Sequence, residues 1–493
     1  MRFVTIMLIC IMLICIISLL RGELMPAEQL PREWRVPEDF PTIQAAIEAA
    51  QEGDTIIVAP GIYREHLVIA KSLALQGAGP DTVLEGEPSE HEPIVEEEEE
   101  ETKEGGYIWM GWSSVGPTMR KVAPPAIVVQ AGQVQIRGLQ IRPWDWQKAL
   151  ETLEGIPSLP SPLRAGVVIE RGAEALIEHV IIRHAHYGIV VKRGASLTLR
   201  HSILHNWHRG LQIWGTATIE DSSIYNEDIY ESESSEVAVI IEGGRVSLRR
   251  NRISIFHVDP YGLSAHRIGD FCDIGVSASN SNVVIEGNQI VGALYHGISV
   301  FRGKASIQKN FIVYQGHHGS GLRISSAEAV VEDNTIFGMM SYGVGIQVTG
   351  GGYESVVGHL PSGKVTVTQV PQAQVTLRRN RIAHNGTGIE VSGAIAELIE
   401  NDVYANKTGL QLTPWMGGEA EYTTDPAKIE MMRNRISQNE ECGIAAQSPK
   451  YVEGKKVYEI FTGQLTGEGN EVQGNFRADL CPPDYPWPPG FRK

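Results

Sequence analysis

The feature that most constrains this 493-residue chain is a short motif that recurs with a nearly constant period. In each copy a glycine is followed by alternating apolar residues, as in Gly166-Val-Val-Ile, Gly188-Ile-Val-Val and Gly210-Leu-Gln-Ile. Within clusters, the successive spacings of this glycine are 22, 22, 22, 24, 24 and 21. A period of this length indicates one repeated structural unit rather than several unrelated domains.

A second motif, an asparagine followed two positions later by Ile or Val, keeps the same period. Its copies begin at Asn251, Asn288, Asn310, Asn334, Asn380, Asn401 and Asn434. The segments between turns alternate apolar and polar residues and leave no room for a crossover helix. Stacking each repeat on the next would pair every strand in parallel and form a continuous core. We therefore predict a coil of parallel strands, with the asparagines stacked in one inward turn.

Residues near the N-terminus carry a resemblance to a known superfamily. The segments 40–50 (FPTIQAAIEAA), 53–65 (GDTIIVAPGIYRE) and 73–79 (LALQGAG) resemble the opening of right-handed parallel β-helix proteins of the pectin-lyase-like superfamily. The later repeats look like the carbohydrate-binding and sugar-hydrolase repeat class, and are similar to the periplasmic β-helix proteins that help to mature nitrous oxide reductase. The resemblance implies an all-β, single-stranded right-handed parallel β-helix, a solenoid with an N-terminal capping helix from about Thr42 to Ala50.

The period also predicts how the chain is divided. We expect one β-helix over residues 36–478 and a Pro-rich C-terminal tail or cap over residues 479–493. Loop insertions are expected at about 86–124, 143–163, 254–274, 349–373 and 414–427.

The N-terminal segment 1–22 predicts export. Arg2 precedes an apolar run that ends at Leu20, a pattern typical of either a signal peptide or a single N-terminal membrane anchor. We expect an extracytoplasmic monomer that is secreted, periplasmic or anchored at the cell surface. In the exported part, a Cys442–Cys481 bridge and unpaired thiols are the two alternatives.

Charge argues against one class of partner. The chain has 42 Lys and Arg against 59 Asp and Glu, a formal net charge of −17, and no basic block. Nucleic acid is therefore not an expected partner. The acidic run Glu96–Glu101 would attract Ca²⁺ if its oxygens converged, but such a run is also typical of a solvated loop.

Polar residues gather in the turn that precedes the repeating glycine. Because residues one coil apart lie about 5 Å from each other, side chains that recur with the period form a stripe along one flank. The pairs His186 and His208, and His296 and His318, both keep the common spacing of the glycine motif. Such a stripe would offer hydrogen bonds, ring stacking and positive charge to a polysaccharide or cell-envelope glycan. The predicted binding residues are His186, Trp207, His208, Arg209, Tyr295, His296 and His318.

The same stripe leaves other interpretations open. Imidazoles at this spacing could converge on a transition metal, although no ligand set is assigned and no cofactor is required by the sequence. Exposed turn residues copied by repeat duplication would need no function at all. A noncatalytic envelope scaffold, or a metal-handling maturation protein, is therefore the alternative to polysaccharide binding.

If the protein is an enzyme, the long loop from residue 257 to 273 is where we expect its chemistry. His257 or His266 would act as general base, and Tyr261 would donate a proton. Arg267 would neutralise a substrate carboxylate, and Asp259 would orient a histidine. These roles suit a polysaccharide lyase or C5-epimerase.

Two enzyme classes differ in how well they fit. A glycoside hydrolase is the alternative to a lyase or epimerase, because Asp259, Asp270 and Asp273 could supply its two carboxylates. The catalytic Asp-Phe-(Ile/Val)-Phe-Gly segment of pectin methylesterases is absent, since residues 270–275 read DFCDIG. We therefore do not expect pectin methylesterase activity.

Overall fold

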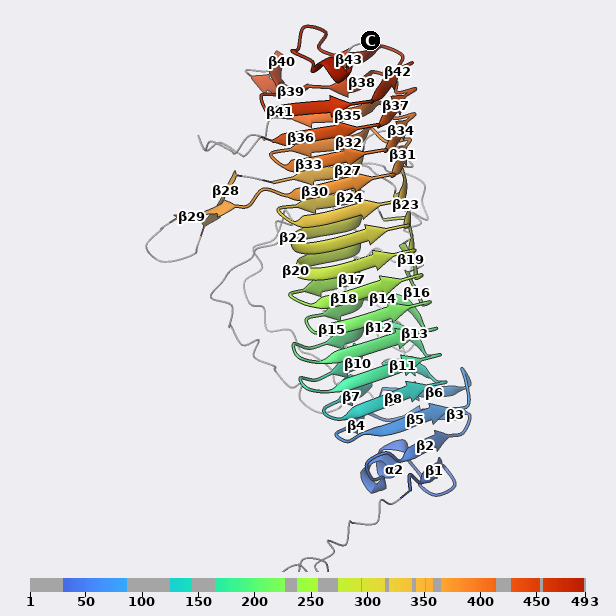
Figure 1. Cartoon of the computed structure of the whole chain (residues 1–493). Helices are drawn as coiled ribbons and strands as arrows, with labels where there is room; N and C mark the ends of the chain where they lie inside the picture. The colour runs from blue at the N-terminus through green and yellow to red at the C-terminus, as the bar shows by residue number, and fades with distance from the viewer. Residues whose placement is uncertain are drawn as a thin grey trace, which may run out of the picture.

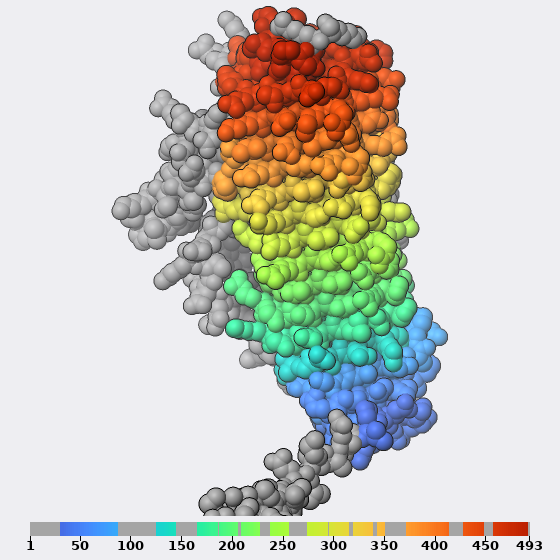
Figure 2. Space-filling model, in the orientation of Figure 1, coloured from blue at the N-terminus to red at the C-terminus, as the bar shows by residue number. Residues whose placement is uncertain are grey.

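The computed structural model shows one long coil whose strands stack from the N-terminus to the C-terminus (Figure 1). It describes residues 30–86, 125–143, 165–226, 237–255, 274–293, 295–314, 319–338, 343–350, 352–357, 365–413, 427–452 and 455–491. A single hydrogen-bonded set of 39 strands forms three lengthwise faces, and every pairing in it is parallel. The predicted coil of parallel strands is confirmed. In Figure 2 successive coils appear as bands stacked along the rod.

Three parallel sheets make the faces, and we name them in the order in which the repeating glycine motif enters them. The first sheet contains β4 (Leu67–Ile69), β7 (Ile127–Val129), β10 (Ala165–Ile169), the C-terminal parts of β12 (Ile181–Val191) and β14 (Ile203–Ile213), β17 (Val237–Glu242), the N-terminal parts of β20 (Ile274–Glu286) and β22 (His296–Gln308), β24 (Ser320–Ser325), β27 (Val344–Thr349), β32 (Thr387–Ser392), β35 (Thr408–Thr413), β38 (Cys442–Ala445) and β43 (Ala478–Cys481).

The second and third sheets follow in each coil. The second contains β1 (Glu33–Val36), β2 (Thr55–Val58), β5 (Leu73–Gly77), β8 (Gln133–Arg137), β11 (Glu174–Glu178), β13 (Ser196–Arg200), β15 (Thr216–Glu220), β18 (Arg245–Arg249), the ends of β20 and β22, β25 (Glu328–Glu332), β30 (Gln374–Arg378), β33 (Ile395–Ile399), β36 (Lys428–Met432) and β41 (Gln464–Glu468). The third contains β3 (Gly61–Arg64), β6 (Thr82–Glu85), β9 (Gln140–Arg142), the starts of β12 and β14, β16 (Ser223–Asn226), β19 (Arg252–Ile255), β21 (Gln289–Val291), β23 (Phe311–Tyr314), β26 (Thr335–Gly338), β31 (Arg381–Ala383), β34 (Asp402–Tyr404), β37 (Arg435–Ser437) and β42 (Glu471–Gln473).

The core runs the length of the coil because each strand turns alternate side chains inward. The apolar residue that follows the repeating glycine is buried in coil after coil of the first sheet. In register these residues are Val167, Ile189, Leu211, Val239, Val276, Ile298, Leu322, Ile346, Ile389, Leu410 and Ile444. The glycine itself lies at a corner. A Cβ on Gly345 would stand 2.4 Å from Ile382 and 2.5 Å from the Gly388 carbonyl, so only glycine fits there.

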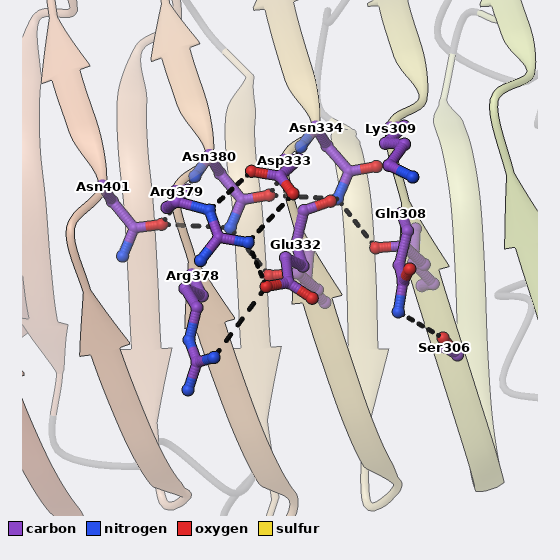
Figure 3. Close-up of polar contacts among 12 residues, drawn as sticks. Ser306, Gln308, Lys309, Glu332, Asp333, Asn334, Arg378, Arg379, Asn380 and Asn401 are labelled. Carbon is purple, nitrogen blue, oxygen red and sulfur yellow. Dashed lines mark hydrogen bonds and ion pairs between the residues drawn. The ribbon is translucent and has the colours of Figure 1, made fainter.

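The corner between the second and third sheets is the most regular part of the coil. From β8 onward each of these connections is two residues long, and the first residue has a left-handed backbone, as in Asp333 and Arg379. The second residue is usually an asparagine, and it is buried. Asn334 Nδ2 donates to Asn380 Oδ1 over 3.0 Å, and Asn380 repeats the bond to Asn401 (Figure 3). The predicted asparagine stack is therefore confirmed.

Charged side chains follow this corner on the solvent side. Arg379 pairs with Asp333 through Nε at 2.8 Å and also contacts Glu332 (Figure 3). Farther toward the N-terminus, Arg250 makes a two-pronged pair with Asp221 at 2.8 Å. The arginine holds the pKa of the Asp333 carboxyl below its ordinary value. Because these pairs join successive coils at the surface, each contributes little, and their repetition mainly favours the native register.

A second asparagine ladder was not anticipated. It occupies the corner between the third and first sheets in the C-terminal half, where Asn385, Asn406, Asn439 and Asn475 bond in turn through their side chains. It ends on Asp479, whose Oδ1 accepts from Asn475 Nδ2 over 2.9 Å. In this half of the coil, two of the three corners are therefore held together by amide–amide hydrogen bonds: the one between the second and third sheets and the one between the third and first sheets.

The two ends of the coil carry different structures. Helix α2 (Ile43–Ala49) lies at the N-terminal end, with Thr42 as its N-cap and Ile43 among its buried residues (Figure 1). At the other end, Tyr485, Trp487 and Phe491 join the core, the last of them in the short 3-10 helix η2 (Pro489–Phe491).

The alternative left open for the C-terminal cysteines is resolved in favour of pairing. Cys442 and Cys481 form a disulfide between neighbouring strands of the first sheet.

Two antiparallel hairpins interrupt the coil between the first and second sheets. One pairs β28 (Gly352–Val357) with β29 (Val365–Val370), and the other pairs β39 (Gln447–Val452) with β40 (Lys455–Ile460). The second hairpin is missing from the predicted insertions. Its sequence alternates like the strands of the coil, so alternation alone did not separate it from them.

Candidate functional site

The placement of the long connections singles out the first sheet. In the N-terminal half they join the third sheet to the first, between β6 and β7, β9 and β10, β16 and β17, and β19 and β20. In the C-terminal half they join the first sheet to the second, after β27, β35 and β38. Along the described strands from β8 onward, the corner between the second and third sheets has none. Because insertions on a regular solenoid usually gather at its functional face, the outer side of the first sheet is the candidate site.

Two outward columns follow the first sheet from coil to coil. The column just before the repeating glycine reads Ala165, Tyr187, Arg209, Val237, Ile274, His296, Ser320, Val344, Thr387 and Thr408. The column three residues later reads Val168, Val190, Gln212, Ile240, Ser277, Ser299, Arg323, Gln347, Glu390 and Gln411. The second column is apolar near the N-terminal end and becomes polar and charged after Ser277.

His296, Ser320 and Arg323 form the most distinctive cluster on this face. The backbone N–H of Ser320 donates to Nδ1 of His296 over 3.2 Å, and the Ser320 hydroxyl lies 2.9 Å from the same nitrogen. On the other side of the ring, Nη1 of Arg323 lies 3.4 Å from Nε2 of His296. Both His296 and Ser320 are buried.

These contacts determine the protonation of His296. A backbone N–H can only donate, so Nδ1 must accept, and a neutral ring then carries its hydrogen on Nε2. Burial, together with the positive charge of Arg323, lowers the pKa of His296 to about 3 and keeps the ring neutral. Since arginine also only donates, two donors face each other across 3.4 Å. An acceptor that approaches the two nitrogens from one side, such as a carboxylate oxygen, could therefore bond to both.

Glu390 lies two coils beyond Arg323 in the same column. Its carboxylate accepts a hydrogen bond from Gln347 Nε2 over 3.2 Å. Burial raises the pKa of Glu390, although the Gln347 bond and the charge of Arg323 act in the opposite direction. A carboxyl group whose pKa is raised by burial has the properties of a proton donor.

Arg209 provides a second cationic point on this face. Its guanidinium carbon lies 5.6 Å from the centre of the Tyr187 ring, within the range of a cation–π contact. Within the described part of the chain, its buried Nε has no hydrogen-bond partner. Arg209 and Arg323 lie on coils that are four steps apart, roughly 19 Å at about 4.8 Å per coil.

The backbone register tests the predicted stripe in part. Ala185 pairs with Trp207 and Tyr187 with Arg209, so His186 and His208 occupy the same position on successive coils. The second pair is a correction, because His296 pairs with Ser320 and not with His318, the coil there being longer by two residues. Tyr295 and His296 do lie together, with ring centres 4.1 Å apart.

Several predicted residues lie outside the described part of the chain. These are the proposed catalytic residues His257, Asp259, Tyr261, His266 and Arg267, together with His318 and the side chains of His186, Trp207 and His208. Their roles stay predictions. The N-terminal segment 1–22 and the acidic run Glu96–Glu101 are also outside it.

The sequence did carry a signal for the residues that were missed. Arg323, Gln347 and Glu390 each stand two residues before the end of the strand, at the variable position of the Gly-Ile-x-Val motif. When the motif is interpreted only as a pattern of core residues, its variable position is ignored. Reading the variable position down the repeats would have shown that Ser299, Arg323, Gln347, Glu390 and Gln411 form one polar column.

Among the described residues, no group of three His, Cys, Asp or Glu side chains is placed to hold a metal ion. Within the same residues, no helix has the length and apolar character needed to span a membrane.

Comparison with known proteins identifies the family. The sequence profile described as "Right handed beta helix region" matches residues 165–359, 262–421 and 321–476. The chain belongs to the right-handed β-helix family. Membership in the right-handed β-helix family agrees with the three parallel sheets and confirms the predicted fold. No curated protein sequence matches the chain.

Solved structures offer remote likenesses to this right-handed β-helix. The A-module of the Azotobacter vinelandii mannuronan C-5 epimerase AlgE4 is 15% identical with a TM-score of 0.38, and the match covers 89% of this chain and 92% of that module. The periplasmic alginate epimerase AlgG is 13% identical with a TM-score of 0.40, over 72% of this chain and 77% of its own. The catalytic domain of a GH87 alpha-1,3-glucanase is 12% identical with a TM-score of 0.31, over 87% and 61%. These likenesses assign no activity to this chain.

Proposed function

We propose that the protein binds an extended acidic polysaccharide along the outer face of the first sheet. The observation that carries the proposal is the pair of opposed donors, His296 Nε2 and Arg323 Nη1, 3.4 Å apart. A uronate carboxylate oxygen that approaches the pair from one side would accept from both, and the bond to arginine would be charge-assisted. A protein partner with an isolated acidic residue would satisfy the same pair but would not use the rest of the column.

The remainder of the face supports an extended ligand. Arg209 supplies a second cation four coils away, and hydroxyl and amide side chains such as Ser299 and Gln347 lie between or beyond the two arginines. Sugar hydroxyls both donate and accept, so a column of Ser, Gln and Glu matches them better than it matches an apolar segment. The long insertions on both edges of the first sheet are consistent with a polymer lying there.

If the protein changes its ligand, Glu390 is the described residue best suited to transfer a proton. It lies about 10 Å from Arg323 along the coil axis, two coils away. Base-catalysed elimination or C5 epimerisation of a uronate needs a neutralised carboxylate and a proton donor, and Arg323 and Glu390 could supply these. A base would then come from elsewhere, with His257 and His266 still the candidates.

We also propose an extracytoplasmic location. It is supported by the Cys442–Cys481 disulfide, because such bonds persist mainly in oxidising compartments. Mass spectrometry after alkylation of freshly lysed cells would test this, and two alkylated thiols in the untreated protein would contradict it.

The proposal is tested with purified protein against a panel of uronate and neutral polysaccharides. Affinity electrophoresis measures binding, while absorbance of unsaturated products and reducing-end assays measure turnover. We expect binding to uronate polymers, weakened at least tenfold by Arg323→Gln, because a charge-assisted bond worth about 1.5–3 kcal/mol is lost. Neutral polymers should not respond to the substitution.

Arg245→Gln is the matched control. Arg245 is an exposed arginine on the second sheet, so the substitution removes the same charge from a different face. Equal losses in Arg323→Gln and Arg245→Gln would mean that binding depends on overall charge and would overturn the proposal. Full binding by Arg323→Gln would do so as well.

A further inference from the structure

The outer face of the third sheet carries aromatic side chains at outward positions of β23, β26 and β34. Phe311 on β23 is 41% exposed, although phenylalanine at an outward strand position gains nothing from contact with water. Its ring centre lies 6.1 Å from that of Phe337 on the next coil, with the planes at 70°. Val291 and Val313 precede Phe337 in the same outward column. The result is an apolar strip on an otherwise hydrophilic surface.

The strip continues toward the C-terminus with a regular spacing. Phe337 is in register with Ala383, and Ala383 with Tyr404, so the two rings stand two coils apart with a methyl group between them. Figure 1 shows the strands concerned, β23, β31 and β34, in order along one edge of the rod. Two coils span roughly 10 Å, close to the length of two pyranose residues in an extended chain.

Cationic side chains border the aromatic strip. Arg381 is exposed, and its Nη2 donates to the Tyr404 hydroxyl over 3.4 Å. His384 is exposed, with its ring 6.1 Å from that of Phe337. Arg435 is also exposed and lies 3.8 Å from Asp402 in an ion pair. Arginine and histidine beside flat aromatic rings match a ligand with both sugar faces and negative charge.

We propose that Phe311, Phe337 and Tyr404, with Arg381, form a second binding platform for acidic polysaccharide on the outer face of the third sheet. The platform would hold the polymer by ring stacking and is distinct from the donor pair at His296 and Arg323 on the first sheet. The ligand class rests on the proposed function, whereas the location rests on the exposed ring of Phe311 and the partly exposed rings of Phe337 and Tyr404. Rings spaced along a parallel sheet favour a periodic polymer over a globular partner, whose surface does not repeat along one axis. A second copy of this coil does repeat, and the self-association measurement below tests it.

The test compares a long uronate polymer with a short uronate oligosaccharide. We expect the double variant Phe337→Ala/Tyr404→Ala to bind the polymer roughly tenfold more weakly, since two stacking contacts are lost. Binding of the oligosaccharide, measured by calorimetry, should depend on Arg323 and stay unchanged in the double variant. Val330→Ala is the matched control, because Val330 is 44% exposed on the second sheet.

Each outcome is decisive. Polymer binding that is unchanged in the double variant but lost in Arg323→Gln would overturn the platform and leave the proposed function intact. Wild-type protein that binds neither polymer nor oligosaccharide would refute the proposed function itself. Self-association in analytical ultracentrifugation that disappears in the double variant would show that the rings serve a second copy of the chain instead. Thermal midpoints close to wild type would establish that the variants fold.

Discussion

Replacing Asn334 by alanine should destabilise the coil more than almost any other single polar substitution. Asn334 is fully buried, and its side chain takes part in five hydrogen bonds. Oδ1 accepts from the backbone N–H and from Nδ2 of Asn310, each over 2.9 Å. Nδ2 lies 2.8 Å from the Ile307 carbonyl, 3.1 Å from the Glu332 carbonyl and 3.0 Å from Asn380 Oδ1.

The magnitude follows from the groups left without partners. Alanine would strand the backbone N–H and one amide hydrogen of Asn310, and would remove the side-chain donor from the Ile307 carbonyl. Each unsatisfied buried group costs about 1–3 kcal/mol, so we expect a loss of about 3–5 kcal/mol. The effect belongs among the large single-residue losses that are diagnostic of a specific mechanism.

Asn470→Ala is the internal comparison. Asn470 ends the same ladder, where it accepts from Asn434 and donates to the Met431 carbonyl, but it is only partly buried, so water can reach the groups that its loss leaves unpaired. Chemical denaturation midpoints, followed by far-ultraviolet circular dichroism, measure both variants at one temperature. We expect the Asn334 variant to lose at least twice as much as the Asn470 variant. Equal losses, or a loss below about 1 kcal/mol for Asn334→Ala, would refute the idea that unpaired buried hydrogen-bonding groups determine the loss of unfolding free energy.

Three further predictions concern charge and covalent linkage. Burial raises the pKa of Glu390, so its ionisation destabilises the folded protein above that raised pKa. Glu390→Gln should therefore increase the thermal midpoint at pH 7, but not at a pH below 4.5, the ordinary pKa of glutamate. An equal gain at both pH values would contradict this cause. The pKa of His296 is lowered from 6.5 to about 3, so the folded protein loses stability relative to the unfolded chain as the pH falls from 6.5 toward 3. The NMR ring signals of His296 should not titrate between pH 8 and pH 5. A midpoint near 6.5 would mean that burial does not control the ring. Removing the disulfide by Cys442→Ser/Cys481→Ser, which opens a loop with a sequence separation of 39, should cost about 4 kcal/mol and make the last coil more sensitive to protease. Protease cleavage at the wild-type rate would show that the bond adds nothing there.

The fold could be predicted from the sequence repeats because the repeated residues are the ones that make the contacts between neighbouring coils. The repeating glycine is required by backbone close approach, and the asparagine satisfies buried turn amides, so both recur in most coils. Coil length was less predictable. His296 and His318 keep the common spacing, but the coil between β22 and β24 is longer by two residues, and the pairing shifts to Ser320. A spacing alone cannot reveal where an extra residue is accommodated in a turn.

Two of the residues predicted from the sequence lie on the face that the structure makes the candidate site. His296 and Arg209 came from the density of polar residues before the glycine, and the structure gives both of them outward positions on the first sheet. Arg323 and Glu390 were missed because each is a single polar residue inside an otherwise apolar strand motif. Their meaning depends on neighbours one or two coils away, and such neighbours become visible only when the strands are aligned by register.

The unequal corners of the coil have a practical consequence for anyone who wishes to remodel it. Two edges already accept excursions ranging from a few residues to a whole hairpin, so foreign loops or affinity tags grafted there should leave the rod intact. The remaining edge, the corner between the second and third sheets, should not tolerate insertions. One added residue in a two-residue turn that carries a ladder asparagine would break the buried amide chain and would also shift the surface ion pairs between neighbouring coils.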